Sequence, residues 1–175
     1  MRFNGTNTVL VVGAHPDDEV LGAGGTIAKH AHSGDEVHTL ILTEGTTQQY
    51  DDRTIIEDKK EQVKDCTNRL GVKKTYFGDL PDMRLDDVPH VDINGVIESV
   101  CEKVKPDIVY THSEREVNQD HIETFDSTLV ATRPKSGVSA ILSYETPSST
   151  NYSPSLEGFE PDLFVDISSH IEDKI

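Results

Sequence analysis

The sequence predicts an α/β fold in which a mostly parallel sheet carries helices on both faces. Apolar runs of strand length alternate with longer amphipathic segments along the 175 residues. One run, Val9–Val12, is apolar without interruption, which is typical of a strand buried on both faces of a parallel sheet. The length suits one substantial core, and no repeat or linker divides it. We therefore expect a single domain over residues 1–175.

The first half of the chain predicts two strands and two helices. Gly34 and Gly71 each follow the last periodic residue of a helical segment, where a glycine is the usual terminator. In chain order, the expected elements are a strand at Val9–Gly13, a helix at Val20–Ser33, a strand at Val37–Thr43, a polar loop at residues 44–54 and a helix at Ile55–Leu70.

The second half continues the alternation. Apolar Ile93, Ile97 and Val100 recur at helical spacing after Pro89, which predicts an amphipathic helix. The expected elements are a short strand at Thr75–Phe77, a loop at Gly78–Pro89, a helix at Val91–Lys105, a strand at Asp107–Thr111, a helix at His121–Thr132 and strands at Ser139–Tyr144 and Phe164–Ile167.

Composition excludes several classes of partner. Asp and Glu number 32 against 16 Lys and Arg, so the net charge is −16. Such a field repels polyanions, and we expect neither nucleic acid nor an anionic membrane as a partner. No apolar run approaches 18 residues and the N-terminus lacks a secretory pattern, so we expect a soluble cytoplasmic protein. Cys66 and Cys101 fall in predicted helices and form no disulfide framework.

Charged and polar residues gather where three predicted strands end. Ligands of open α/β sheets bind beyond the carboxyl ends of the strands, so these side chains are expected to meet at one rim. The residues are His15, Asp17 and Asp18 after the first strand, Glu44 after the second, and His112, Asn118, Asp120 and His121 after the strand at Asp107–Thr111.

This group has the composition of a catalytic metal site. Carboxylates massed at the end of a buried strand are costly unless a cation neutralises them. Zinc in catalytic sites takes three ligands from His, Asp or Glu and leaves a position for water. His15 and Asp18 flank Pro16 and could face one ion, with His121 as the distant third ligand. Fe²⁺ and Mn²⁺ accept the same ligand types.

The remaining carboxylate beside these ligands, Asp17, suits a general base. It could take a proton from a water activated by the ion and return that proton to a leaving amine. The set is therefore equipped for amide hydrolysis.

The hexapeptide at residues 14–19, Ala-His-Pro-Asp-Asp-Glu, resembles the signature of the LmbE-like, or PIG-L-like, N-acetylglucosamine deacetylases. The similarity continues at residues 21–25, 60–62, 70–72, 81–85, 105–112, 120–121 and 131–134. The resemblance implies a Rossmann-like fold, zinc dependence and removal of acetyl from N-acetylated amino sugars or their conjugates. By matching positions, it implies His15, Asp18 and His121 as metal ligands and Asp17 as the base.

Two features depart from the family pattern. Many members have a histidine three residues before the distal ligand, where it helps to hold the oxyanion. Asn118 stands there in this chain, and an amide donates a hydrogen bond without positive charge. His112 could supply a cation from the neighbouring strand end. Family members also run several dozen residues further, so we expect a C-terminal portion to be missing after Ile175.

The same residues allow other interpretations. Asp17 or Asp18 could cap the following helix, and His121 could simply begin one. The Gly22–Gly25 segment could suggest a nucleotide-binding loop, but it lacks the G-x-G-x-x-G order and the acids before it would repel phosphate.

The outer residues of the predicted site also have more than one possible role. Asp120 could orient a ligand, and Arg53 and Glu44 could bind substrate hydroxyls or could be solvated. The partner we expect is a small N-acetylated sugar or glycoconjugate, and a homo-oligomer stays open. The alternative function is a weakly active or inactive module that binds a metal or sugar through the same pocket.

Overall fold

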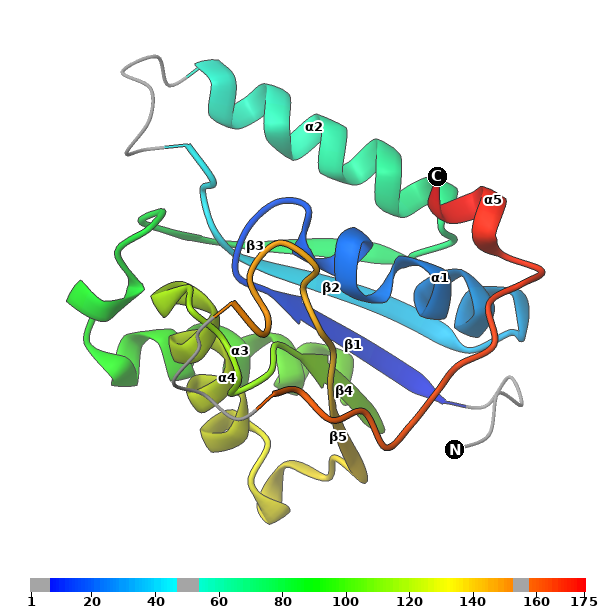
Figure 1. Cartoon of the computed structure of the whole chain (residues 1–175). Helices are drawn as coiled ribbons and strands as arrows, with labels where there is room; N and C mark the ends of the chain where they lie inside the picture. Colours follow the sequence, from blue (N-terminus) through cyan, green and yellow to red (C-terminus); the bar gives the residue numbers. More distant parts are fainter. Residues whose placement is uncertain (1–6, 47–53, 153–157) are drawn as a thin grey trace.

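The structure is a computed structural model that describes residues 7–46, 54–152 and 158–175. Within these residues, parallel strands form one sheet in the order β3-β2-β1-β4-β5 (Figure 1). The strands are β1 (Thr8–Gly13), β2 (Glu36–Thr43), β3 (Lys74–Leu80), β4 (Ile108–Thr111) and β5 (Ala140–Ser143). The predicted parallel sheet is confirmed.

Helices cover both faces of this sheet. The helices α1 and α2 lie on one face and α3 and α4 on the other, with α5 beside α1 (Figure 1). The helices are α1 (Asp18–His32), α2 (Thr54–Arg69), α3 (His90–Val104), α4 (Gln119–Ala131) and α5 (Ile171–Lys174), with short 3₁₀ helices at Leu85–Asp87 and Pro134–Ser136.

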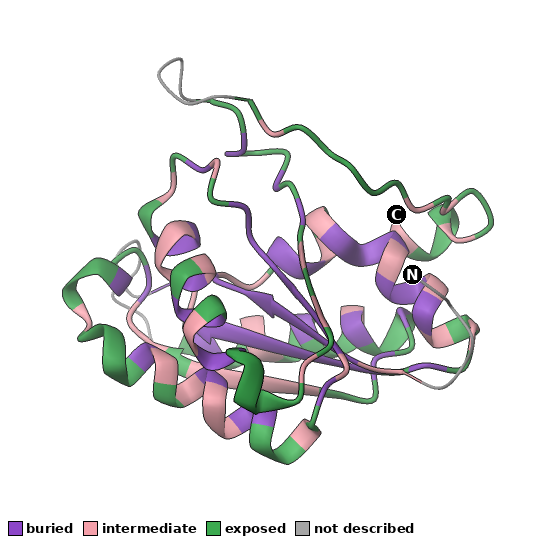
Figure 2. Ribbon diagram, turned by 90° about the horizontal axis from the view of Figure 1, so that it is seen from below, coloured by how far each residue is buried: buried purple, intermediate pink, exposed green. Residues whose placement is uncertain are grey.

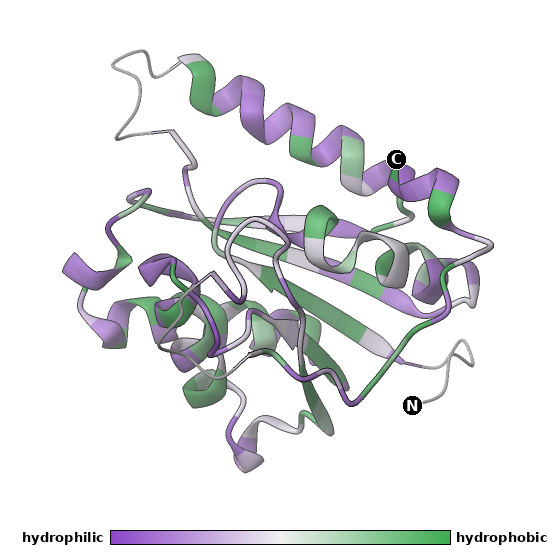
Figure 3. Cartoon of the chain, viewed as in Figure 1, coloured by the Kyte–Doolittle hydropathy of each residue, from purple (hydrophilic) through white to green (hydrophobic). Residues whose placement is uncertain are grey.

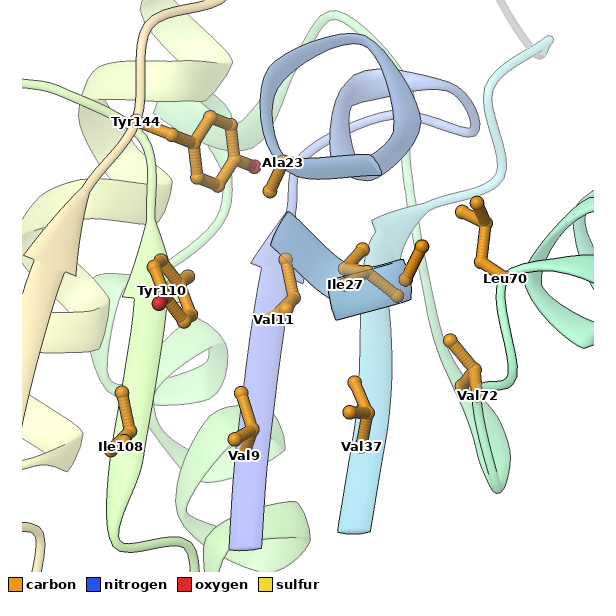
Figure 4. Close-up of a cluster of buried hydrophobic side chains, with 11 residues drawn as sticks. Val9, Val11, Ala23, Ile27, Val37, Leu70, Val72, Ile108, Tyr110 and Tyr144 are labelled. Carbon is orange, nitrogen blue, oxygen red and sulfur yellow. The ribbon is translucent and has the colours of Figure 1, made fainter. Parts of the chain in front are cut away.

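The two faces of β1 pack into two separate apolar clusters. Val9 and Val11 contribute to the cluster beneath α1 that includes Ile27 (Figure 4). Leu10 and Val12 point the other way, into a cluster that includes Ile97 of α3. Because neither face meets solvent, every residue of the run must be apolar, and the central strands are buried along most of their length (Figure 2).

The strand order places a topological switch point between β1 and β4. From β1 the chain moves outward to β2 and β3, and the connecting helices α1 and α2 lie on one face. The helices α3 and α4, which lead to β4 and β5, lie on the other face. Val11 of β1 pairs with Tyr110 of β4, so the carboxyl ends of these strands lie side by side. The loops that follow them lead to opposite faces, and such a position is the usual ligand site of this architecture.

The outermost helix, α2, is mostly hydrophilic (Figure 3). Among its residues only Ile56, Val63 and Thr67 are buried, as expected for a helix with one narrow apolar stripe. Cys66 on α2 and Cys101 on α3 are free thiols, as the sequence predicted. In the described part of the chain, no helix has the length and apolarity needed to cross a membrane.

One expected strand is wrong. Residues Phe164–Ile167 are irregular backbone rather than a strand. The segment lies against α1 instead of along a sheet edge: the carbonyl of Asp166 accepts a hydrogen bond from Lys29 Nζ at 2.8 Å, and Phe164 is 80% exposed. The segment packs on α1 through Ile167, which lies against Gly25, and does not add a strand to the sheet.

Other boundaries shifted by one to three residues. The first helix begins at Asp18 rather than Val20, and α4 begins at Gln119 rather than His121. The short strand expected at Thr75–Phe77 extends to Leu80.

Candidate metal centre and active site

The turn between β1 and α1 brings His15 and Asp18 together. The backbone N–H of His15 donates to Asp18 Oδ2 at 2.8 Å, and the backbone N–H of Asp18 donates to the His15 carbonyl at 3.3 Å. His121 comes from the first turn of α4, the helix that follows β4. The neighbouring positions of β1 and β4 in the sheet therefore join residues that are far apart in the sequence.

Three side-chain atoms form a small triangle at this point. His15 Nδ1 lies 3.2 Å from Asp18 Oδ2 and 3.2 Å from His121 Nε2, and His121 Nε2 lies 3.3 Å from Asp18 Oδ2. Ligands of a tetrahedral ion with the bond lengths of zinc lie about 3.4 Å from one another. The donor set and its spacing fit a divalent metal ion.

The other nitrogen of each of these histidines faces a carboxylate. His15 Nε2 lies 3.1 Å from Asp120 Oδ2, and His121 Nδ1 lies 3.1 Å from Glu116 Oε2. A carboxylate on the second ring nitrogen is the usual way to fix the tautomer of a metal-binding histidine.

Two other groups of potential metal ligands share a histidine with this triangle. His15 also forms a ligand-like group with Asp82 and Asp120, and His121 forms one with His112 and Glu116. The carboxylates of those groups lie on the outer nitrogens, His15 Nε2 and His121 Nδ1, where they can fix the tautomers, so we favour the triangle as the metal site.

The residues behind Asp120 and Glu116 hold these carboxylates in place. The backbone N–H of Leu85 donates to Asp120 Oδ1 at 3.0 Å. Thr150 Oγ1 donates to Glu116, and Ser149 Oγ lies 3.2 Å from His121 Nδ1. The loop after β5 thus contributes to the site through small polar residues.

Sequence reasoning missed Glu116, Asp82 and this loop. Asp82 lies 3.7 Å from His15 Nε2 and falls within the family-like segment at residues 81–85, which was a usable signal. Glu116 is 2% exposed inside a polar stretch of sequence, and only the fold reveals that burial.

His112 is fully buried beside the triangle. Its Nε2 accepts the backbone N–H of Ala14 at 3.0 Å, and its Nδ1 lies 3.2 Å from Thr146 Oγ1. Burial lowers the pKa of His112, although the nearby Asp18 carboxylate works in the opposite direction. The geometry favours a neutral ring that supports the turn after β1, rather than the cation suggested from sequence.

The pKa values of the three triangle residues show that the site favours positive charge. Burial opposes protonation of His15, but hydrogen bonds to Asp120 and Asp18 raise its pKa to about 10. Burial likewise opposes a charge on His121, yet contacts with Asp18 and Glu116 raise its pKa. Burial alone would raise the pKa of Asp18, whereas its contacts with His112, His121 and His15 hold this pKa well below its usual range. The site stabilises positive charge, which a proton or a metal ion can provide.

Asp17 stands at the exposed edge of the same turn. Its backbone φ is +143°, a region that favours glycine, so the turn holds this residue under strain. Desolvation and the Asp18 carboxylate raise the pKa of Asp17. Its backbone N–H donates to Glu19 Oε2 at 3.3 Å, and burial raises the pKa of Glu19 to about 8. Asp17 is thus an accessible carboxylate close to the triangle.

The remaining candidates lie further out. Asn118 caps α4, because its Oδ1 accepts the backbone N–H of Asp120 at 3.0 Å. Glu44 is half-buried directly after β2, and its backbone N–H donates to the Leu80 carbonyl at 2.9 Å. Substrate contacts by either side chain stay predictions. Arg53 lies outside the described residues.

Comparison with known proteins identifies the family. The model of the family described as PIG-L, GlcNAc-PI de-N-acetylase, matches residues 10–132, which is more than half of the chain. The chain belongs to the PIG-L family. The resemblance inferred from the hexapeptide at residues 14–19 is confirmed.

Two curated relatives of this PIG-L chain are deacetylases by name. An uncharacterized deacetylase of Escherichia coli, YaiS, is 30% identical over 148 residues, which cover 80% of this chain and 74% of that protein. The diacetylchitobiose deacetylase of Thermococcus kodakarensis is 35% identical over 112 residues, which cover 61% of this chain and 41% of that protein. The chain therefore spans less than half of the second relative.

Solved structures share the PIG-L fold. The N,N'-diacetylchitobiose deacetylase from Pyrococcus horikoshii superposes with a TM-score of 0.77 over 97% of this chain and 67% of that one, at 24% identity. At this identity, the similarity establishes the fold alone.

A third curated relative has a different reaction. The 4-oxalmesaconate hydratase of Pseudomonas putida is 30% identical over 126 residues, which cover 65% of this chain and 47% of that protein. Membership of the PIG-L family therefore does not by itself fix the reaction.

Proposed function

We propose that this chain is a metal-dependent hydrolase that removes acetyl from an N-acetylated amino sugar or sugar conjugate. The observation that carries the proposal is the triangle of His15, Asp18 and His121, with edges of 3.2–3.3 Å, next to the accessible carboxylate of Asp17. Deacetylase names among its relatives support the same reaction.

His15 Nδ1, Asp18 Oδ2 and His121 Nε2 would hold the ion. When bound, a divalent ion lowers the pKa of water and stabilises the negative charge that develops on a carbonyl oxygen. We assign zinc because two imidazoles and a carboxylate are typical zinc ligands, and Fe²⁺ and Mn²⁺ remain alternatives.

Asp17 is the proposed general base. Its carboxylate would accept a proton from the attacking water and later deliver that proton to the nitrogen of the leaving amine. The raised pKa of Asp17 suits this exchange, since a base nearer neutrality can both take and return a proton.

Asp120 and Glu116 act on the histidines rather than on the substrate. Each accepts a hydrogen bond from a ring nitrogen and thereby keeps the other nitrogen unprotonated and aimed into the triangle. We assign His112 to the support of the turn at Ala14.

The substrate class rests on the relatives. Two related proteins are named for diacetylchitobiose, and the family description names a GlcNAc conjugate. The net charge of −16 favours a substrate that is neutral or cationic over one with several negative charges. A cytoplasmic location, and the absence of nucleic acid and membrane partners, belong to the same proposal.

Acetate release after metal loading tests the reaction. The metal-free chain and the zinc-loaded chain would be assayed on N-acetylglucosamine, a glucosaminyl conjugate and a short chitooligosaccharide. We expect acetate only from the loaded protein, and about 10²–10⁴-fold slower release from Asp17→Asn despite full zinc content. A longer chain that includes residues after Ile175 is assayed in parallel, because the match covers only 41% of the Thermococcus kodakarensis deacetylase.

Two outcomes would replace this function. Zinc binding without acetate release in both chain lengths would favour the non-enzymatic binding module. Addition of water to an unsaturated carboxylate, with no acetate from any sugar, would favour a hydratase like the third relative.

A further inference from the structure

A second group of potential metal ligands lies at the far end of α1. His32 is the last residue of this helix, and His170 and Asp173 come from the segment around α5. One ligand atom from each of the three side chains lies within 4.8 Å of the others. Because α1 has 15 residues, this group is about 21 Å along the helix from Asp18 and is separate from the site above.

His32 presents the correct nitrogen for a metal. Its Nδ1 lies 2.9 Å from the carbonyl oxygen of Ala28. A carbonyl can only accept, so Nδ1 carries the proton and Nε2 keeps its lone pair. The imidazole is therefore held in a metal-binding tautomer by its own helix.

His170 has a buried ring nitrogen without a hydrogen bond. The Nδ1 atom of His170 is buried and makes no hydrogen bond, although it lies 3.4 Å from Asp173 Oδ2. Buried polar atoms are normally satisfied, so this atom requires an explanation. The distance of 3.4 Å matches the separation of two ligands on one tetrahedral ion, about 3.4 Å for zinc.

The two imidazoles face each other across the helix end. Their ring centroids are 4.8 Å apart and the ring planes are tilted by 40°. The site also lies at the carboxyl end of α1, where the helix dipole favours a cation.

Contacts other than these ligands dock the segment on α1. Lys174 Nζ donates to the Leu21 carbonyl at 2.9 Å, and Ile167 occupies the space that a side chain at Gly25 would fill. Figure 1 shows α5 beside α1, and the two helices are in contact. The three ligands are thus brought together by packing before any ion binds.

We propose that His32, His170 and Asp173 bind a second divalent transition-metal ion of the zinc class, which ties the segment around α5 to α1. His32 Nε2, His170 Nδ1 and an Asp173 carboxylate oxygen are the ligands, and water completes the coordination. This proposal does not depend on the deacetylase reaction, because it concerns binding alone.

Metal stoichiometry tests the proposal. The metal-free chain would be titrated with Zn²⁺ by calorimetry and with Co²⁺ by visible absorption. We expect two equivalents for the wild type and one for His32→Ala. His32 is exposed, so this substitution should leave the fold intact, as circular dichroism would check. The exposed His90 provides the matched control, and His90→Ala should keep both equivalents.

Removal of the first site isolates the second. Asp18→Asn/His121→Ala should still bind one equivalent, with the Co²⁺ spectrum of a four-coordinate site. Zn²⁺ should raise the melting temperature of this variant, and adding His32→Ala should abolish both effects. The proposal is overturned if His32→Ala binds as many equivalents as the wild type, if Asp18→Asn/His121→Ala binds none, or if His90→Ala loses as much metal as His32→Ala. A wild-type protein that binds both equivalents but releases no acetate would contradict the proposed function and leave the second site in place.

Discussion

His15 Nδ1 lies 3.2 Å from His121 Nε2, although the two residues are 106 positions apart in the chain. Their opposite ring nitrogens face Asp120 and Glu116, so the facing nitrogens both retain lone pairs when the rings are neutral. Two lone pairs this close repel each other unless a proton or a metal ion lies between them. This relationship and the adjacent Asp18 oxygen define the candidate centre.

Replacement of Asp17 should separate catalysis from metal binding. We expect Asp17→Asn to lower turnover by about 10²–10⁴-fold, the usual contribution of a general base, with unchanged zinc content. Acetate release and metal analysis on the same sample measure the two effects. A variant with wild-type turnover would remove Asp17 from the mechanism.

The strained backbone at Asp17 predicts that replacement by glycine stabilises the fold, although it removes the proposed base. Because φ is +143°, Asp17→Gly should relieve strain of about 1–3 kcal/mol, offset in part by the larger entropy of unfolded glycine. We expect the free energy of unfolding in urea to rise by about 1 kcal/mol while turnover is lost. Equal or lower stability would show that the turn is unstrained.

Glu116 should control metal affinity without being a ligand. Loss of a carboxylate behind a ligating histidine typically weakens metal binding by 10–100-fold, and we expect about this effect for Glu116→Gln. Competition with a chromophoric chelator measures the affinity. The nearby, exposed Glu114 provides the control, and Glu114→Gln should bind metal like the wild type. Equal affinities for the two variants would argue against the role assigned to Glu116.

Two glycines in helices should respond oppositely to alanine. A Cβ at Gly22 would lie 2.3 Å from Tyr144 Cδ2 and 2.9 Å from the Glu145 carbonyl oxygen. We expect Gly22→Ala to lose about 1–3 kcal/mol of unfolding free energy through overpacking. Gly95 in α3 has open space, so Gly95→Ala should gain about 0.5–1 kcal/mol. Urea unfolding of both variants checks the pair, and a stable Gly22→Ala protein would contradict the close packing.

The buried His30 should make stability depend on pH. Its Nδ1 lies 2.6 Å from Asp35 Oδ2 and its Nε2 lies 3.0 Å from the Tyr110 hydroxyl. Burial lowers the pKa of His30, despite the opposing effect of Asp35. As the pH falls below about 6.5, the unfolded chain therefore binds a proton before the folded one does, and this contribution to stability declines.

The size of that effect is bounded. One such group contributes at most about 1.4 kcal/mol per pH unit between 6.5 and its folded pKa. We expect the wild type to lose more stability than His30→Gln between pH 7 and 5.5 in urea unfolding, and His90→Gln to behave like the wild type. His15 and His121 have raised pKa values and act in the opposite direction, but equally in all three proteins. Parallel curves for the wild type and His30→Gln would contradict the prediction.

The sequence determined the architecture and the nucleus of the site. An uninterrupted apolar run at Val9–Val12 requires burial on both faces, and helical periodicity between such runs requires crossover connections, so a parallel sheet follows from local pattern alone. The hexapeptide at residues 14–19 then identified the family, because its order of residues is specific.

Only the tertiary structure decided which other side chains are buried beside the site and what they contact. Burial of Glu116 and of His112 depends on the loop after β5, whose residues are 28 or more positions away from their contacts. Residues Phe164–Ile167 have a strand-like composition, but the available surface was α1 rather than a sheet edge. Local sequence sets which backbone shapes are favourable, whereas burial and charge pairing depend on which distant segments pack together.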